Sequence, residues 1–97
     1  MPTYISLLRW TQQGIENVKQ SPARLDAAKQ AFRAMGAELK TFYLVLGRYD
    51  GVVVAEAPNA EAVAKVALSL GSRGAIRTET LRAFTEDEYR KIIAALP

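Results

Sequence analysis

The sequence contains no cysteine and no histidine. Disulfide bonds, thiolate nucleophiles and the Cys/His ligand sets of zinc and haem sites are therefore excluded. The Ser-His and Cys-His forms of nucleophilic catalysis are excluded too, and so is a histidine general base near neutral pH. We expect neither a cofactor nor a metal ion.

The sequence also lacks a long apolar run, because none approaches the about 20 residues that cross a bilayer. Residues 1–5 lack the basic start and cleavage site of a secretory signal, so we expect a cytoplasmic location. The net charge of +3 comes from 13 basic and 10 acidic residues interleaved along the chain. A nucleic-acid binder gathers its basic residues in one patch. The sequence predicts no membrane and no nucleic-acid partner.

The length of the chain, 97 residues, favours a single domain that spans residues 1–97. Residues 3–10 are strand formers with apolar side chains in both parities, which is typical of a central strand. Residues 37–46 and 51–57 form two further strands, and the short turn between them predicts an antiparallel hairpin. Residues 75–84 form a fourth, more polar strand.

Helix start signals lie between these strands. Thr11 can cap a short helix, and Asn59 caps a later one. Between them, Ser21 caps a longer helix that has Pro22 at its first position and ends at Gly36. Thr85 has a glutamate three residues later, which is the capping-box spacing, and it begins a C-terminal helix. The order β-α-β-β-α-β plus a last helix predicts an α+β, ferredoxin-like domain with a four-stranded antiparallel sheet.

Two helices cover only one face of such a sheet, and the other face is also apolar. An open apolar patch of several hundred Å² is rare in soluble monomers. We therefore predict a homodimer packed sheet to sheet. The sequence does not decide whether dimers assemble into higher oligomers. The predicted interface residues are Tyr4, Ser6, Leu8, Trp10, Thr41, Tyr43, Val45, Val52, Val54 and Glu56, with part of residues 75–84. The pattern leaves open which parity of residues 75–84 faces inward.

Four segments of the sequence carry a family resemblance. They are Gly-Arg-Tyr-Asp at 47–50, Glu-Ala-Pro-Asn at 56–59, Leu-Ser-Leu-Gly-Ser at 68–72 and the strand at 76–84. With the opening strand they cover nearly the whole chain and resemble the GYD-domain family, which is named for a glycine and the Tyr-Asp pair. The motif residues are Gly47, Tyr49 and Asp50. The resemblance implies a dimeric α/β-barrel fold and no established activity.

One position departs from the family pattern: Gly51 stands where we expect a larger apolar residue, and we expect looser packing of the hairpin there. Tyr49 and Asp50 are interpreted first as turn chemistry, since Asp bonds nearby backbone N–H groups in turns. The carboxylates at residues 86–88 are interpreted as partners of the helix dipole rather than metal ligands.

The candidate ligand-binding residues combine aromatic and charged side chains on the predicted strands. They are Trp10, Tyr43, Glu56, Arg77, Glu79 and Arg82. Such a set suits a small apolar or anionic ligand. The simpler interpretation is that the aromatics form interface core and the charges pair across strands.

Two functions stay open. The first is a homo-oligomeric module that binds a small molecule or interacts with other proteins. The alternative is a cofactor-independent enzyme of the dimeric α/β-barrel type, monooxygenase- or isomerase-like, by analogy of fold alone. Its base would be Glu56, Glu79 or Asp50, with Trp10 and Tyr43 shaping the substrate. Because an enzyme needs a reachable cavity beside a carboxylate, such a cavity separates the two hypotheses.

Overall fold

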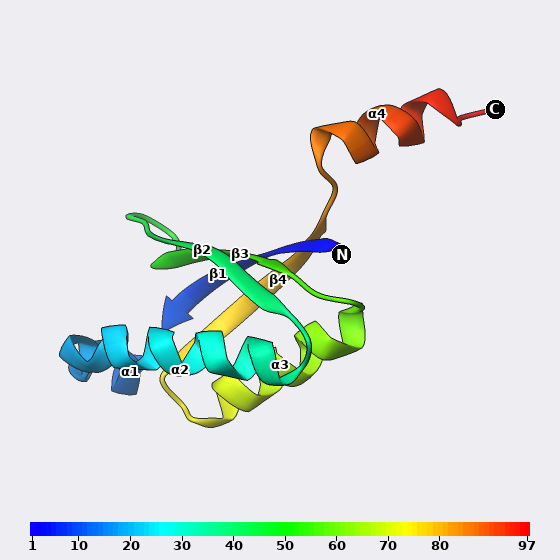
Figure 1. Cartoon of the computed structure of the whole chain (residues 1–97). Coiled ribbons are helices and arrows are strands. Elements are labelled where there is room, and N and C mark those ends of the chain that lie inside the picture. The colour runs from blue at the N-terminus through cyan, green and yellow to red at the C-terminus, as the bar shows by residue number, and fades with distance from the viewer.

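The computed structural model describes residues 1–97 as one four-stranded antiparallel sheet with helices. The elements in chain order are β1 (Thr3–Trp10), α1 (Gln12–Glu16), the 3-10 turn η1 (Val18–Gln20), α2 (Ser21–Ala34), β2 (Glu38–Leu44), β3 (Gly51–Glu56), α3 (Ala60–Ser72), β4 (Ile76–Ala83) and α4 (Glu86–Ala94). The strand order is β2-β3-β1-β4, and α2 and α3 lie together on one face (Figure 1). The predicted ferredoxin-like α+β fold with an additional C-terminal helix is confirmed.

Local capping signals place the helix starts where the sequence predicts them. The Thr11 hydroxyl accepts a hydrogen bond from the Gly14 N–H at 3.1 Å, and the Asn59 side chain accepts one from the Ala62 N–H at 2.9 Å. Thr85 forms the complete capping box of α4. The prediction for α2 is displaced by one residue, because Ser21 is the first helical residue and makes no capping bond.

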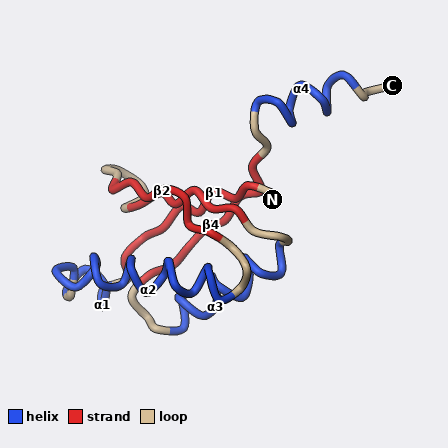
Figure 2. Tube along the Cα trace, viewed as in Figure 1, coloured by secondary structure: helices blue, strands red, loops and turns tan.

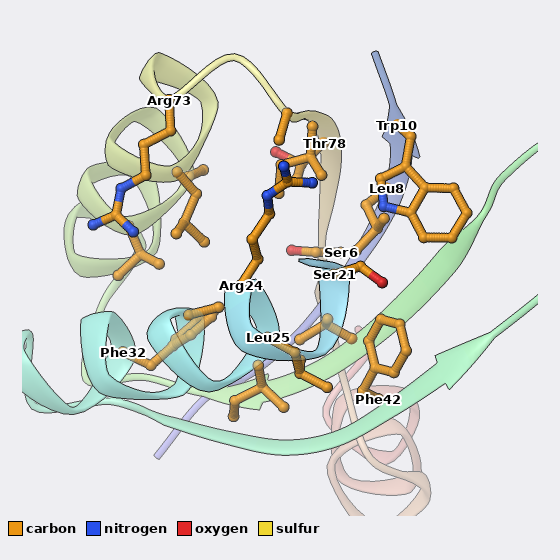
Figure 3. A pocket seen from close by; sticks show the side chains of 18 of the residues that line it. Ser6, Leu8, Trp10, Ser21, Arg24, Leu25, Phe32, Phe42, Arg73 and Thr78 are labelled. Atoms are coloured by element: carbon orange, nitrogen blue, oxygen red, sulfur yellow. The ribbon is translucent and has the colours of Figure 1, made fainter. Parts of the chain in front are cut away.

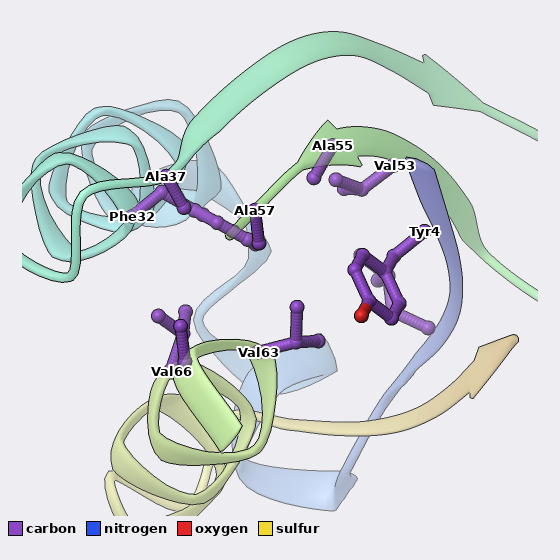
Figure 4. Packing of buried hydrophobic residues seen from close by; sticks show 10 residues of the cluster. Tyr4, Phe32, Ala37, Val53, Ala55, Ala57, Val63 and Val66 are labelled. Atoms are coloured by element: carbon purple, nitrogen blue, oxygen red, sulfur yellow. The ribbon is translucent and has the colours of Figure 1, made fainter. Parts of the chain in front are cut away.

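The hydrophobic core lies between the sheet and the two helices. Tyr4 of β1 and Val53 of β3 face Val63 and Val66 of α3, as Figure 4 shows, and Phe32 of α2 closes the cluster. These five side chains are at most 6% exposed. The core is thus small, since only 13 of the 97 residues are buried.

The predicted direction of the β1 side chains is wrong. Tyr4 and Leu8 are core residues, and Ser6 and Trp10 lie on the same, helix-covered side of β1. When a strand is apolar in both parities, its sequence does not show which set of side chains faces the core. The pairing with β3 decides it: Ile5 lies opposite Val54, so the odd-numbered residues of β1 share the uncovered face with Val54.

Two glycines sit where neighbouring atoms leave no room for a side chain. A Cβ at Gly51 would lie 3.0 Å from Leu8 Cγ and 3.0 Å from Phe42 Cε2. The expectation that Gly51 loosens the hairpin is therefore wrong, because the neighbouring side chains already fill its place. A Cβ at Gly14 would lie 2.0 Å from the Ala75 carbonyl oxygen, so α1 approaches this backbone closely.

The C-terminal helix α4 stands apart from the rest of the domain. It leaves the end of β4 on the side of the sheet away from α2 and α3 (Figures 1 and 2), and it contains no buried residue. The molecule is elongated as a result, with extents of 51 × 30 × 18 Å. None of the helices has the length and apolar character required to span a bilayer.

Candidate functional site

The sheet face that α2 and α3 leave uncovered is called the open face below. Its centre consists of two rows of residues paired across the four strands. The first row is Thr41, Val54, Ile5 and Leu81, and the second is Tyr43, Val52, Leu7 and Glu79. Tyr43 is 60% exposed and Leu81 is 46% exposed. The centre of the open face is thus apolar and unprotected by its own chain.

Two like-charge pairs lie at diagonally opposite corners of the open face. Glu38 of β2 lies directly opposite Glu56 of β3, while Arg9 of β1 lies directly opposite Arg77 of β4. Because β4 is an edge strand, the Arg77 side chain bends around it, and its guanidinium lies beside Gly71 of α3. Like charges in such positions repel each other. Of the two, only the acidic corner contains an ion pair, between the Lys40 ammonium and Glu38 at 3.7 Å. The two corners are called the acidic corner and the basic corner below.

Tyr49 of the hairpin turn reaches over the basic corner. Its hydroxyl donates a hydrogen bond to Glu79 Oε2 at 3.2 Å, and the Arg9 guanidinium carbon lies 5.0 Å from the centre of its ring. Turn chemistry therefore does not account for Tyr49, whose contacts are with distant strands. The sequence analysis did not single out Arg9, and no pattern within its own strand marks this residue.

Asp50 has a structural role in the same turn. Its carboxylate accepts a hydrogen bond from the Trp10 N–H at 2.9 Å, and its own N–H donates to the Leu8 carbonyl at 2.8 Å. These bonds fasten the hairpin to the end of β1. Gly47 has a φ of 108°, a conformation that favours glycine. Gly47 and Asp50 thus shape the turn that carries Tyr49.

The six candidate ligand-binding residues do not form one pocket. Tyr43, Glu56 and Glu79 lie on the open face, whereas Trp10 and Arg82 belong to the opposite parity of their strands. Arg77 has the parity of the open face, but its guanidinium lies beside Gly71 of α3. The Arg82 guanidinium stacks 4.2 Å from the centre of the Phe84 ring and lies 4.0 Å from Glu88. The predicted grouping of Trp10, Tyr43 and Glu56 around one ligand is wrong, because the sheet separates Trp10 from the other two.

The carboxylates at the start of α4 act within the helix cap. The Thr85 N–H donates to Glu88 Oε1 at 2.9 Å, and this bond lowers the pKa of the Glu88 carboxyl. Arg90 pairs with Glu86 at 2.8 Å along the same helix. The structure contains no group of three His, Cys, Asp or Glu side chains that could hold a metal ion.

A hollow lies on the side of the sheet that α2 and α3 cover. It is a cavity of about 470 Å³ between α2, α3 and the strands (Figure 3), and Trp10 lies on its wall. Most of its wall is hydrophobic, and its only charged residues are Arg24 and Arg73. No Asp or Glu lines it. The carboxylates Glu56, Glu79 and Asp50 are therefore not beside this cavity.

Comparison with known proteins identifies the family of this chain. The sequence model of the GYD domain matches residues 4–93. The chain is a member of the GYD-domain family. A relative from Thermus thermophilus is 42% identical over 84 residues, which are 86% of this chain and 88% of the relative. That protein is named glutamine synthetase and cystathionine beta-lyase binding protein.

A solved structure resembles most of this GYD-domain chain. The crystal structure of TTHA0845 from Thermus thermophilus superimposes with a TM-score of 0.56 at 26% sequence identity. The match covers 88% of this chain and 95% of the other. The arrangement of sheet and helices is thus shared with a crystallised protein.

Proposed function

We propose that this GYD-domain protein is a protein-interaction module that works as a homodimer, with the open faces of two copies packed together. The observation that carries the proposal is the pattern of the open face: an apolar centre lies between an acidic and a basic corner. A two-fold contact uses the same surface on both copies, so each corner is used twice.

The charges of the open face complement a second copy. A two-fold arrangement can place the acidic corner of each copy over the basic corner of the other. Arg9 and Arg77 of one copy then neutralise Glu38 and Glu56 of its partner at both ends of the interface. Complementary charges fix the orientation of a complex and suppress wrong partners. Such a partner would offset the repulsion within each corner, which Lys40 already reduces at the acidic one.

The apolar centre supports the same arrangement. Ile5, Leu7, Val52 and Val54 are already half-buried by their neighbours, so a flat facing surface removes their remaining area from water. Each Å² of apolar surface buried contributes about 25 cal/mol. Helix α4 departs on this side of the sheet, and its exposed apolar residues lie where a second copy would meet them. They are Tyr89, Ile92, Ile93 and Leu96.

Binding of other proteins is supported by the relative, whose name states that it binds glutamine synthetase and cystathionine beta-lyase. The alignment with 42% identity covers 88% of that relative. The enzyme hypothesis lacks a comparable support. Its proposed bases Glu56, Glu79 and Asp50 are absent from the wall of the large cavity.

Charge reversal tests the dimer. The double variant Arg9→Glu, Arg77→Glu has two acidic corners, and the double variant Glu38→Lys, Glu56→Lys has two basic corners. We expect each variant alone to sediment as a monomer and an equimolar mixture to form a heterodimer. A matched control reverses Arg33, which is exposed on α2 away from the open face. An acidic variant that remains dimeric, or a mixture that fails to associate, would refute the arrangement.

Interaction with the enzymes is tested separately. Purified glutamine synthetase and cystathionine beta-lyase from the same organism as this chain are passed over the immobilised protein. We expect saturable binding of at least one of the two. Absence of binding to both, with the dimer intact, would remove the support taken from the relative.

A further inference from the structure

The cavity between α2, α3 and the sheet is too large to be a packing defect. An engineered apolar cavity of about 150 Å³ already binds benzene, and the cavity here is about 470 Å³. Small-molecule sites range from about 300 to 1,000 Å³ and are mostly apolar with a few polar groups. Size and lining therefore match a ligand site.

The wall divides into an apolar part and a basic part. Leu25 of α2 lies beside Phe42 of the sheet in the apolar part, Leu8 and Trp10 flank them, and Phe32 lies farther along α2 (Figure 3). At the other end the Arg24 side chain rises from α2 toward Thr78 of β4, as Figure 3 shows. The site thus has a place for a hydrocarbon body and, next to it, a cationic group.

Arg24 is the exceptional residue of this wall. Its Nη1 atom is the one buried side-chain nitrogen or oxygen without a hydrogen-bond partner in the structure. The guanidinium also takes part in none of the ion pairs, which join Lys40, Arg82 and Arg90 to glutamates. A buried unpaired donor on a charged group is costly. Protein atoms close off Nη1 itself, but an anion bound against the part of the guanidinium that lines the cavity would offset its unpaired charge.

We propose that the cavity binds an aliphatic carboxylate, with the hydrocarbon chain among the apolar residues and the carboxylate on Arg24. A guanidinium matches the geometry of a carboxylate and binds it with paired, charge-assisted hydrogen bonds. A single negative charge suffices, because Arg24 is the single cation inside and Arg73 lies exposed at the rim. The site is separated from the open face by the sheet, so it goes beyond the proposed interaction function.

The protein contains its own reporter for this site. Trp10 is the only tryptophan of the chain and lines the cavity, so its fluorescence emission responds to a bound chain. We titrate the protein with sodium decanoate below its micellar concentration and use decanol as the neutral probe of equal length. We expect a saturable change in emission with decanoate and at least about tenfold weaker binding of decanol.

Variants then separate the head group from the chain. Arg24→Gln should weaken decanoate about tenfold or more and leave decanol unchanged, whereas Arg33→Gln on the exposed side of the same helix should change neither. Ala28→Phe fills the cavity and keeps Arg24, so both probes should be lost. Circular dichroism confirms that each variant is folded.

Three results would overturn the proposal. They are the absence of a saturable response to decanoate, equal binding of decanol and decanoate, and unchanged decanoate binding by folded Arg24→Gln. The test does not depend on the dimer, since the charge-reversed variants of the open face keep the cavity and serve for a parallel titration.

Discussion

Replacing Asp50 by alanine should destabilise the protein. The Asp50 carboxylate accepts a hydrogen bond from the Trp10 N–H at 2.9 Å, and alanine leaves this half-buried donor without its partner. Hydrogen bonds to charged groups contribute about 1.5–3 kcal/mol to stability. Because the site is partly open to water, we expect about 1.5–2 kcal/mol. For a domain of this size that lowers the Tm by roughly 10 °C.

Urea denaturation followed by circular dichroism measures this loss. Protein concentration is held constant, because the stability of an oligomer depends on it. Asp50→Asn keeps one acceptor oxygen and should lose less than half as much, while Arg48→Ala, an exposed residue of the same turn, should be neutral. A variant Asp50→Ala as stable as the unmodified protein would refute the structural role assigned to this aspartate.

Three further predictions address other parts of the molecule. Val54→Asp should yield monomer or aggregate in size-exclusion chromatography, whereas Leu68→Asp on exposed α3 should not. Gly14→Ala should lower the urea-derived free energy of unfolding by about 1–3 kcal/mol, since its Cβ meets the Ala75 carbonyl. The Glu88 pKa is lowered in the folded chain, so cap stabilisation is present above the ordinary glutamate pKa of about 4.3 and lost as pH falls below it. Circular dichroism should show a loss of helicity below this pH, and the loss should be smaller in Glu88→Gln.

The parts of the fold that the sequence predicts are those that local chemistry decides. Thr11, Asn59 and Thr85 each need only a backbone N–H two or three residues away to act as caps. The short turn between β2 and β3 similarly decides that the two strands pair antiparallel. Because every determinant lies within a few residues, composition and spacing contain the required information.

The features that the sequence missed depend on distant contacts. β1 is apolar in both parities, and only its pairing with β3 shows that Tyr4 and Trp10 face the helices. The Tyr49 hydroxyl bonds to Glu79, a residue 30 positions away, and Arg9 packs on the ring of the same tyrosine. The cavity is set by the spacing of two helices above the sheet, which no linear pattern contains.

Sedimentation equilibrium of the unmodified protein is the most direct test of whether a second copy covers the open face. We predict a particle of twice the chain mass of 10.7 kDa, which separates into single chains when either charged corner of the open face is reversed in sign. A stable particle of one chain mass across the whole concentration range would contradict the dimer and leave the apolar face open to water.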